Sequence, residues 1–154
     1  SELTTKTYPE EVIEGMWSNG SIIFLNPLTI EELTIENDSY NDTNVTELKL
    51  SGWTRLKRIV IGDECFGKVR VVELDGLNEL ESVVIGWFSF GGDGSCRIVN
   101  CPKLESIQIG DYSFSDYHSF ELSNLPSLQS IDIDGWCFYD APSFSLTGLS
   151  DWLV

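Results

Sequence analysis

The sequence predicts a mostly β solenoid, with two short strands in each 24-residue turn and little helix. Three observations support this prediction. Apolar residues return every 24 positions along most of the chain, and a fixed period in this range is typical of solenoids. Short stretches within each unit alternate apolar and polar residues, as half-buried strands do. Residues that favour turns separate these stretches.

The repeat occupies positions 54–149 as four units of 24 residues. Stacking of such units buries the apolar columns that they share. The columns of the first half are Leu56, Leu80, Leu104 and Leu128; Ile59, Val83, Ile107 and Ile131; Ile61, Ile85, Ile109 and Ile133; and Phe66, Phe90, Phe114 and Phe138. Those of the second half are Leu74, Ile98, Leu122 and Leu146, and then Leu77, Cys101, Leu125 and Leu149. We expect the phenylalanine column to form a buried aromatic spine.

The chain before these four units divides into two parts. Residues 1–29 are expected to form an N-terminal cap segment, because the ends of a solenoid need a polar cover. The acidic residues that follow Pro9 suit the first turn of a helix. Residues 30–53 are expected to form an irregular first repeat. Ile30 and Leu56 lie 26 positions apart, so an insertion falls between Asn37 and Thr46.

Residues 150–154 begin a fifth repeat that the sequence does not finish. Trp152 falls in its first core column, and Leu153 and Val154 continue the same strand. An apolar strand without a neighbour is a site of association. We therefore expect these three residues to form an assembly end that packs against another chain or against residues that follow them.

Composition excludes several classes of function. The 154 residues include 25 acidic and 9 basic side chains, which gives a net charge of −16. This charge repels phosphate backbones, so we expect no nucleic-acid partner. It suits either a basic protein partner or simple solubility. No apolar run approaches the roughly 18–20 residues of a membrane-spanning helix, so we expect no membrane span.

The sequence offers little for catalysis. Cys96 and Cys101 replace apolar core residues, whereas Cys65 and Cys137 share a column three repeats apart, too far for a disulfide. His118 lies in a variable turn without a partner of fixed role. No phosphate-binding loop and no nucleophile motif is present. We therefore expect that the chain is not an enzyme and uses no cofactor.

Three aspartates are the best candidates for a metal site. Asp111, Asp132 and Asp134 carry oxygens of the kind that calcium binds, since hard cations need several oxygen ligands. No EF-hand loop and no calcium-binding nonapeptide accompanies them. We therefore expect no metal site.

The repeat resembles the leucine-rich repeat. Leu128, Ile131 and Ile133 match its opening pattern L-x-x-L-x-L, and the period lies within the range of that family. The run from Gly62 to Phe66, which recurs in the next two units, is similar to the I-G-x-x-A-F of the BspA-like class. The positions of the usual buried asparagines hold Glu64, Phe88, Tyr112 and Trp136. The resemblance implies a repeat domain like those of bacterial and protist surface proteins.

Side chains that point out of the first strand and its turn form the predicted binding surface. Early units place apolar residues there and later units place polar ones. Exposed apolar residues on a sheet face are candidates for binding, and cover by the N-terminal segment is the alternative. The candidate residues are Val60, Val84, Trp87, Gln108, Asp111 and Asp132.

The irregular third of the chain carries an excess of N-x-S/T sequons. Chance predicts about 1.4 such motifs for this composition. The sequence has four, at Asn19, Asn37, Asn41 and Asn44. They are either N-glycosylation sites of a secreted chain or accidental matches in a polar loop.

Together these features predict a non-enzymatic repeat domain for protein–protein interaction or adhesion, located at the cell surface or outside the cell. One alternative is a structural subunit that stacks end to end into a filament, because head-to-tail contacts that do not close build fibres. Another is a cytoplasmic acidic adaptor for a basic partner, which the free cysteines favour.

Overall fold

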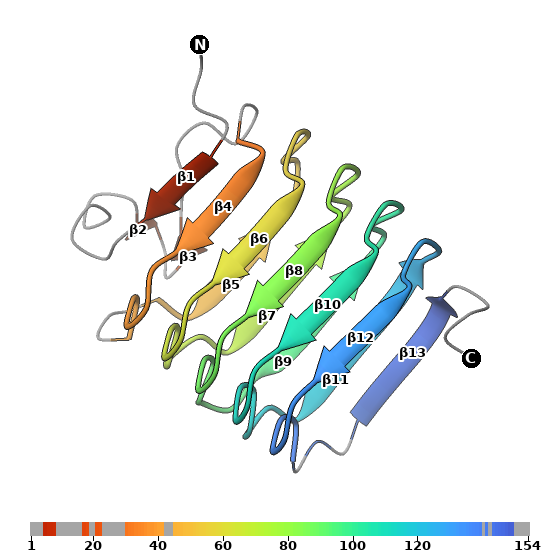
Figure 1. The fold of residues 1–154 in the computed structure, drawn as a ribbon. Helices are drawn as coiled ribbons and strands as arrows, with labels where there is room; N and C mark the ends of the chain where they lie inside the picture. Colours follow the sequence, from red (N-terminus) through yellow and green to blue (C-terminus); the bar gives the residue numbers. More distant parts are fainter. Residues whose placement is uncertain are drawn as a thin grey trace.

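The computed structural model describes residues 5–8, 17–18, 21–22, 30–41, 45–139, 141 and 143–149. Within these ranges the chain has strands and turns but no helix, and it forms a β-solenoid of about five turns with about 24 residues in each. The predicted fold class is confirmed. Each turn of the solenoid, here called a rung, contributes one strand to each of two sheets (Figure 1). The helix expected after Pro9 falls outside the described residues.

The first sheet has six strands, and all of its neighbours run parallel. In spatial order they are β1 (Thr5–Tyr8), β4 (Glu32–Ile35), β6 (Arg58–Ile61), β8 (Ser82–Ile85), β10 (Ser106–Ile109) and β12 (Ser130–Ile133). From β6 onward the pairing joins residues 24 apart, as in Ile59 with Val83. Between β4 and β6 it joins residues 26 apart, as in Leu33 with Ile59. The two extra residues lie between β4 and β5, so they lengthen a turn and leave the strand register intact.

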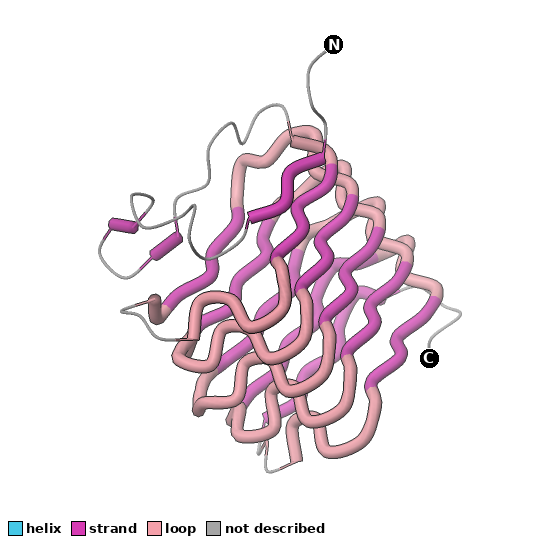
Figure 2. The backbone as a smooth tube through the Cα atoms, turned by 60° about the vertical axis from the view of Figure 1, so that its left-hand side comes forward, coloured by secondary structure: helices cyan, strands magenta, loops and turns pink. Residues whose placement is uncertain are grey.

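The second sheet has seven strands in the order β13, β11, β9, β7, β5, β3, β2. They are β2 (Trp17–Ser18), β3 (Ser21–Ile22), β5 (Glu47–Leu50), β7 (Val71–Asp75), β9 (Ser95–Val99), β11 (Ser119–Leu125) and β13 (Ser143–Leu149). Neighbours run parallel except β2 and β3, which are antiparallel. A long turn such as 62–70 leads from the first sheet to the second and a shorter one such as 76–81 leads back. The turns of successive rungs stack into rows (Figure 2).

The core lies between the two sheets and is made of the predicted apolar columns. Leu56, Ile59 and Phe66 are at most 1% exposed, and the equivalent residues of the next two rungs are also buried. The prediction is wrong at Leu146, which is 47% exposed. This residue lies on β13, which has a neighbouring strand on one side only among the described residues. Ile131 on β12 is half-buried for the same reason.

A stack of aromatic rings runs through the core and confirms the predicted spine. Successive ring centroids are 5.0, 5.1, 4.6 and 5.0 Å apart, close to the ~4.8 Å between neighbouring strands. The rings belong to Tyr40, Phe66, Phe90, Phe114 and Phe138. The spine therefore extends one rung beyond the predicted column. The void left between the sheets measures about 20 Å³, which is room for about one water molecule, so a ligand has no space inside.

A ladder of serine and cysteine side chains ties each long turn to the one before it. The hydroxyl of Ser89 accepts the N–H of Cys65 at 3.1 Å and donates to the carbonyl of Gly62 at 2.8 Å. Ser113 repeats both contacts one rung later. A small side chain that can donate to the carbonyl satisfies this contact, which explains why the column holds only serine and cysteine from position 65 to position 137. Burial raises the pKa of the Cys65 thiol to about 11, so this thiol stays protonated and unreactive at neutral pH.

The glycine that follows each of the strands β6, β8 and β10 is required by close approach of the backbone. A Cβ atom on Gly86 would lie 2.2 Å from the Oδ1 atom of Asp63. One on Gly110 would lie 2.8 Å from the main chain of Gly86. Neighbouring rungs therefore touch here through their main chains. The turns that follow are consequently held at the same separation as the strands.

Candidate binding surface

The most prominent feature of the surface is a stack of exposed aromatic side chains on the long turns. Phe88, Tyr112 and Trp136 follow β8, β10 and β12, and we call them the aromatic stripe. They are 49%, 39% and 54% exposed. The ring centroids of Phe88 and Tyr112 are 4.8 Å apart, and those of Tyr112 and Trp136 are 6.0 Å apart. Trp87 contacts one end of the stripe and Tyr139 the other.

The backbone of the repeat places the stripe. Phe88, Tyr112 and Trp136 share one column and all have positive φ, at 55°, 62° and 65°. The N–H of Phe88 donates to the carbonyl of Asp111, and that of Tyr112 donates to the carbonyl of Gly135, both at 2.9 Å. Each turn is therefore fixed to the next turn. The aromatic side chains stand on a rigid base, so less conformational entropy is lost when a partner binds them.

The ring planes decide what the stripe can contact. Phe88 and Tyr112 are inclined by 6° and Tyr112 and Trp136 by 8°, so neighbouring rings face each other. A planar ligand does not fit between rings whose centroids are 4.8 Å apart, because stacking on both sides needs roughly twice the van der Waals contact distance. The stripe therefore presents ring edges, as a narrow apolar ridge, and offers no stacking slots.

The surface residues predicted from the sequence lie beside this ridge. Val84 on β8 pairs in register with Val60 on one side and with Gln108 on the other, and Gln108 pairs with Asp132. The four form one row across the outer face of the first sheet, which we call the outer row. Val60 and Val84 are half-buried, whereas Gln108 and Asp132 are exposed. The remaining two candidates, Trp87 and Asp111, lie in the turns.

Trp87 contacts the stripe. It is 45% exposed, and its ring meets Phe88 edge-on at a centroid distance of 5.3 Å and an angle of 80°. Asp111 precedes Tyr112, and its Oδ1 atom accepts the N–H of Gly135 at 2.9 Å. Of the six predicted residues, four therefore form the outer row, Trp87 contacts the stripe, and Asp111 is hydrogen-bonded to the turn that carries Trp136.

Sequence reasoning missed the stripe itself. The signal is present in the sequence, because three of the four residues of this column after position 54 are aromatic (Phe88, Tyr112 and Trp136) and the fourth is Glu64. The column coincides with the asparagine position of leucine-rich repeats, so the resemblance points to missing asparagines and not to an aromatic surface. Tyr139 had no signal, since its column shows no aromatic repeat.

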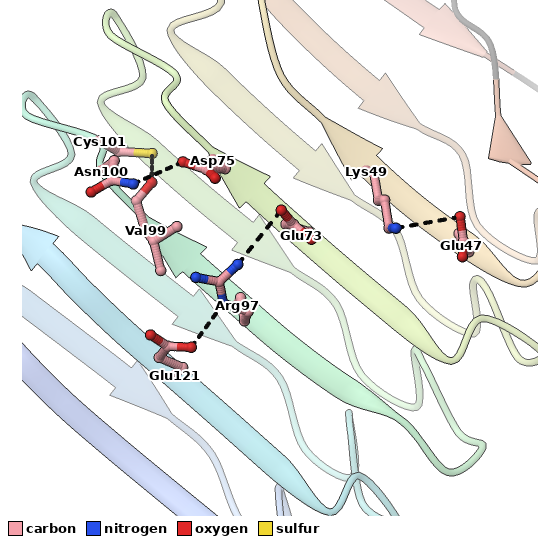
Figure 3. Close-up of polar contacts among 9 residues, drawn as sticks. All are labelled: Glu47, Lys49, Glu73, Asp75, Arg97, Val99, Asn100, Cys101 and Glu121. Carbon is pink, nitrogen blue, oxygen red and sulfur yellow. Dashed lines mark hydrogen bonds and ion pairs between the residues drawn. The ribbon is translucent and has the colours of Figure 1, made fainter.

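On the outer face of the second sheet, charged side chains form ion pairs with one another. Arg97 on β9 lies between Glu73 on β7 and Glu121 on β11, at 3.6 and 2.8 Å (Figure 3). The hydrogen bond that Arg97 donates to Glu121 raises the pKa of Arg97 further. Lys49 and Glu47 pair within β5 at 3.7 Å. This face is a set of internal ion pairs, and it is the weaker candidate for a partner.

Two of the four sequons lie among the described residues. The side-chain oxygen of Asn37 accepts the N–H of Asp63 at 2.8 Å. Asn41 accepts the N–H of Gly67 and donates its amide to the carbonyl of Glu64. Both side chains therefore help to hold the first long turn against the second. The other two sequons, Asn19 and Asn44, and the predicted assembly end at Trp152, Leu153 and Val154 lie outside the described residues.

Groups for other chemistry are scattered. Among the described residues, no group of three or more histidine, cysteine, aspartate or glutamate side chains is placed to hold a metal ion. Within the same part of the chain, no helix has the length and apolar character needed to cross a membrane. The Nδ1 atom of His118 lies 2.9 Å from a carboxylate oxygen of Asp93, and both side chains are more than half exposed.

No protein-family model, no curated protein sequence and no solved structure matches the chain.

Proposed function

We propose that this chain is a non-enzymatic interaction domain that binds another protein through the aromatic stripe and the adjoining outer row. The observation that supports this proposal is a continuous series of exposed aromatic side chains on a rigid base. Trp87, Phe88, Tyr112, Trp136 and Tyr139 are each at least 39% exposed. Aromatic side chains are enriched at the centres of protein interfaces, where they contribute most of the binding free energy.

The geometry favours a protein over a small ligand. The space inside the solenoid is too small for a ligand, and the stripe offers a ridge of ring edges instead of slots between rings. A ridge suits an extended apolar surface or a peptide segment. The net charge of −16 disfavours nucleic acid as the partner.

The resemblance to the BspA-like leucine-rich repeats supports a location at the cell surface or outside the cell, and a role in adhesion. The sequons support the same location. Intact mass before and after enzymatic deglycosylation tests it on material from the native source, with Asn41 and Asn44 as the expected sites. A native mass equal to that of the bare polypeptide would favour the alternative, a cytoplasmic acidic adaptor.

The binding proposal is tested by selecting ligands and then removing the stripe. A random peptide library displayed on phage is selected on the immobilised parent chain, and the affinity of the enriched peptides is measured by fluorescence polarisation. The stripe variant carries Phe88→Ser, Tyr112→Ser and Trp136→Ser. We expect it to bind these peptides about tenfold more weakly or worse, as loss of interface anchors does.

A matched control separates loss of the stripe from general loss of apolar surface. The control carries Phe144→Ser and Leu146→Ser, which remove side chains that are 51% and 47% exposed on the second sheet. It should bind the peptides as the parent does. The proposal fails if selection enriches no peptide, or if the stripe variant and the parent bind equally well. Circular dichroism confirms that each variant is folded.

A second candidate function, end-to-end assembly, is favoured by the apolar end of the solenoid. Phe144 and Leu146 on β13 are about half exposed, and Ile131 and Ile133 on β12 are half-buried. A further rung placed there would cover all four. The opposite end is less suited to a regular filament, because β2 runs antiparallel to β3 and interrupts the parallel order of the second sheet.

Sedimentation velocity over a range of concentrations tests the assembly. If it occurs, the parent chain forms larger species as its concentration rises, and Leu146→Asp or Trp152→Asp returns it to a monomer. A parent chain that stays monomeric at high concentration contradicts this candidate and leaves the interaction domain.

A further inference from the structure

The part of the solenoid that carries the stripe has an unbalanced charge. All nine basic residues of the chain lie at or before Lys103, whereas eight of its 25 acidic residues follow that position. The last two basic side chains already have partners. Arg97 pairs with Glu73 and Glu121, and Lys103 pairs with Glu79 at 2.7 Å. The surface around the later rungs is therefore strongly negative.

Two carboxylates stand beside the aromatic ridge. Asp111 directly precedes Tyr112, and its Oδ1 atom accepts the N–H of Gly135, the residue before Trp136. Asp134 is exposed, two residues before Trp136. Burial raises the pKa of the Cys137 thiol, and the nearby charges of Asp111 and Asp134 raise it further. Both carboxylates thus lie close to the same turn as the stripe.

The column of the stripe is also acidic at its other end. Glu64 and Asp38 occupy the same column one and two rungs before Phe88, respectively, and their side chains hydrogen-bond to each other. The pKa of Glu64 is raised by that hydrogen bond and further by the charges of Asp38 and Asp63. Three acidic groups are thus crowded where the aromatic residues stop.

We propose that the stripe binds a segment of a partner protein that is rich in arginine or lysine and carries apolar residues between the basic ones. This inference rests on the interaction function proposed above and adds the chemistry of the partner. The alkyl stems of the basic side chains and the apolar residues lie along the ring edges. The charged heads pair with Asp111 and Asp134.

The ring geometry shapes this mode of binding. A cation attracted by an aromatic ring sits over its face, but both faces of Tyr112 and one face each of Phe88 and Trp136 are covered by a neighbouring ring of the stripe. The attraction must therefore come from the carboxylates, and the rings supply apolar contact. Binding of this kind needs both features together, because exposed ion pairs alone are weak.

Synthetic peptides of three compositions test the inference directly. The first alternates arginine and leucine, the second replaces arginine with glutamate, and the third replaces leucine with serine. Their affinities for the intact chain are measured by fluorescence polarisation at physiological salt. We expect binding of the arginine–leucine peptide, no binding of the glutamate peptide, and roughly tenfold weaker binding of the arginine–serine peptide.

A pair of charge variants locates the contact. Asp111→Asn with Asp134→Asn removes two charges, and the amide oxygen at position 111 still accepts the N–H of Gly135. The matched control is Glu81→Gln with Glu105→Gln, in a column before the first-sheet strands where Gln129 is already present. We expect the first pair to weaken binding of the arginine–leucine peptide roughly fivefold, as two exposed ion pairs would, and the control pair less than twofold.

The outcomes separate this inference from the function on which it rests. Equal weakening by the two charge pairs means that attraction is non-specific and overturns the inference. A fourth peptide replaces the arginine of the first with serine. If it binds as well as the arginine–leucine peptide and its binding depends on the stripe, the inference is overturned but the interaction function stays in place. If the stripe variant binds the arginine–leucine peptide as tightly as the parent chain does, both this inference and the interaction function through the stripe are contradicted.

Discussion

The hydroxyl of Tyr117 donates a hydrogen bond to the main-chain carbonyl of Val69, which lies 48 residues earlier and two rungs away. The ring of Tyr117 packs edge-on against Phe114, with centroids 4.8 Å apart and planes inclined by 81°. It passes Gly94, where an added Cβ atom would lie 2.8 Å from the ring. Burial raises the pKa of this hydroxyl, so it remains a proton donor at neutral pH. One side chain thus connects three rungs.

Replacing Tyr117 tests this connection. Tyr117→Phe keeps the ring but leaves the buried carbonyl of Val69 without its donor. We expect the free energy of unfolding to fall by about 1–3 kcal/mol, measured by urea denaturation followed by circular dichroism. Tyr112→Phe is the matched control, because its side chain is on the exposed stripe, and it should change stability by less than about 0.5 kcal/mol. Equal effects of the two changes would mean that the bond to Val69 does not contribute.

The two aromatic stacks should differ in their contribution to stability. Phe114→Ala removes a fully buried ring from the spine, so we expect a loss of about 3–5 kcal/mol in the free energy of unfolding. Phe88→Ala removes a half-exposed ring that stacks on one neighbour, so we expect a loss of about 1 kcal/mol. Denaturant titration of both variants measures the difference. A comparable loss at both positions would show that the stripe is a structural element.

The serine and cysteine ladder predicts how replacing Ser89 with alanine or with cysteine changes stability. Ser89→Ala leaves the N–H of Cys65 and the carbonyl of Gly62 without partners, which should cost about 1–3 kcal/mol of stability. Ser89→Cys should cost less, because Cys137 in the same column already donates to the carbonyl of Gly110 at 3.1 Å. Thermal and urea unfolding compare the two. If Ser89→Cys is the more destabilising change, the hydrogen bonds of the ladder do not explain why serine and cysteine occupy this column.

The crowded acids predict a dependence of stability on pH. The hydrogen bond to Asp38 is the main cause of the raised pKa of Glu64, followed by partial burial and the charges of Asp38 and Asp63. A carboxyl group whose pKa is higher in the folded chain than in the unfolded chain lowers stability at neutral pH. That stability returns as the pH falls through the raised pKa.

Glu64→Gln should therefore unfold at a higher denaturant concentration than the parent at pH 7. The difference should shrink on acidification, because the parent then becomes protonated at this position. Urea titrations at neutral and acidic pH measure both quantities. A difference that stays constant with pH would mean that the charge of Glu64 is not responsible.

The sequence predicts the architecture well because stacking copies one set of contacts from rung to rung. A column such as that of Phe66 recurs at every period, and burial of the whole column follows once the period is recognised. Leu146 departs from its column because burial also requires a neighbouring rung, and β13 has a described strand on one side only. The repeat period predicts burial only for residues that have a neighbouring rung on both sides.

The candidate site was predicted only in part. The alternation of strands indicates which residues point outward, so the outer row of Val60, Val84, Gln108 and Asp132 follows from the sequence. The side on which Phe88 and Tyr112 stand depends on the positive φ of a turn residue. Non-glycine residues rarely adopt that conformation, and no pattern of apolar residues signals it. The same turn carries Phe90, two positions later, into the core.

The most direct test of the stripe as a binding surface uses the tryptophan side chains as reporters. Trp87 and Trp136 are 45% and 54% exposed at the stripe, whereas Trp53 is buried at 5%. In a nitrogen-15 NMR titration with the arginine–leucine peptide, we expect the indole signals of Trp87 and Trp136 to move together with the amide signals of Phe88 and Tyr112. The signal of Trp53 should stay in place. Peptide binding that leaves Trp87 and Trp136 unmoved would contradict the proposal that the aromatic stripe is where this protein meets its partner.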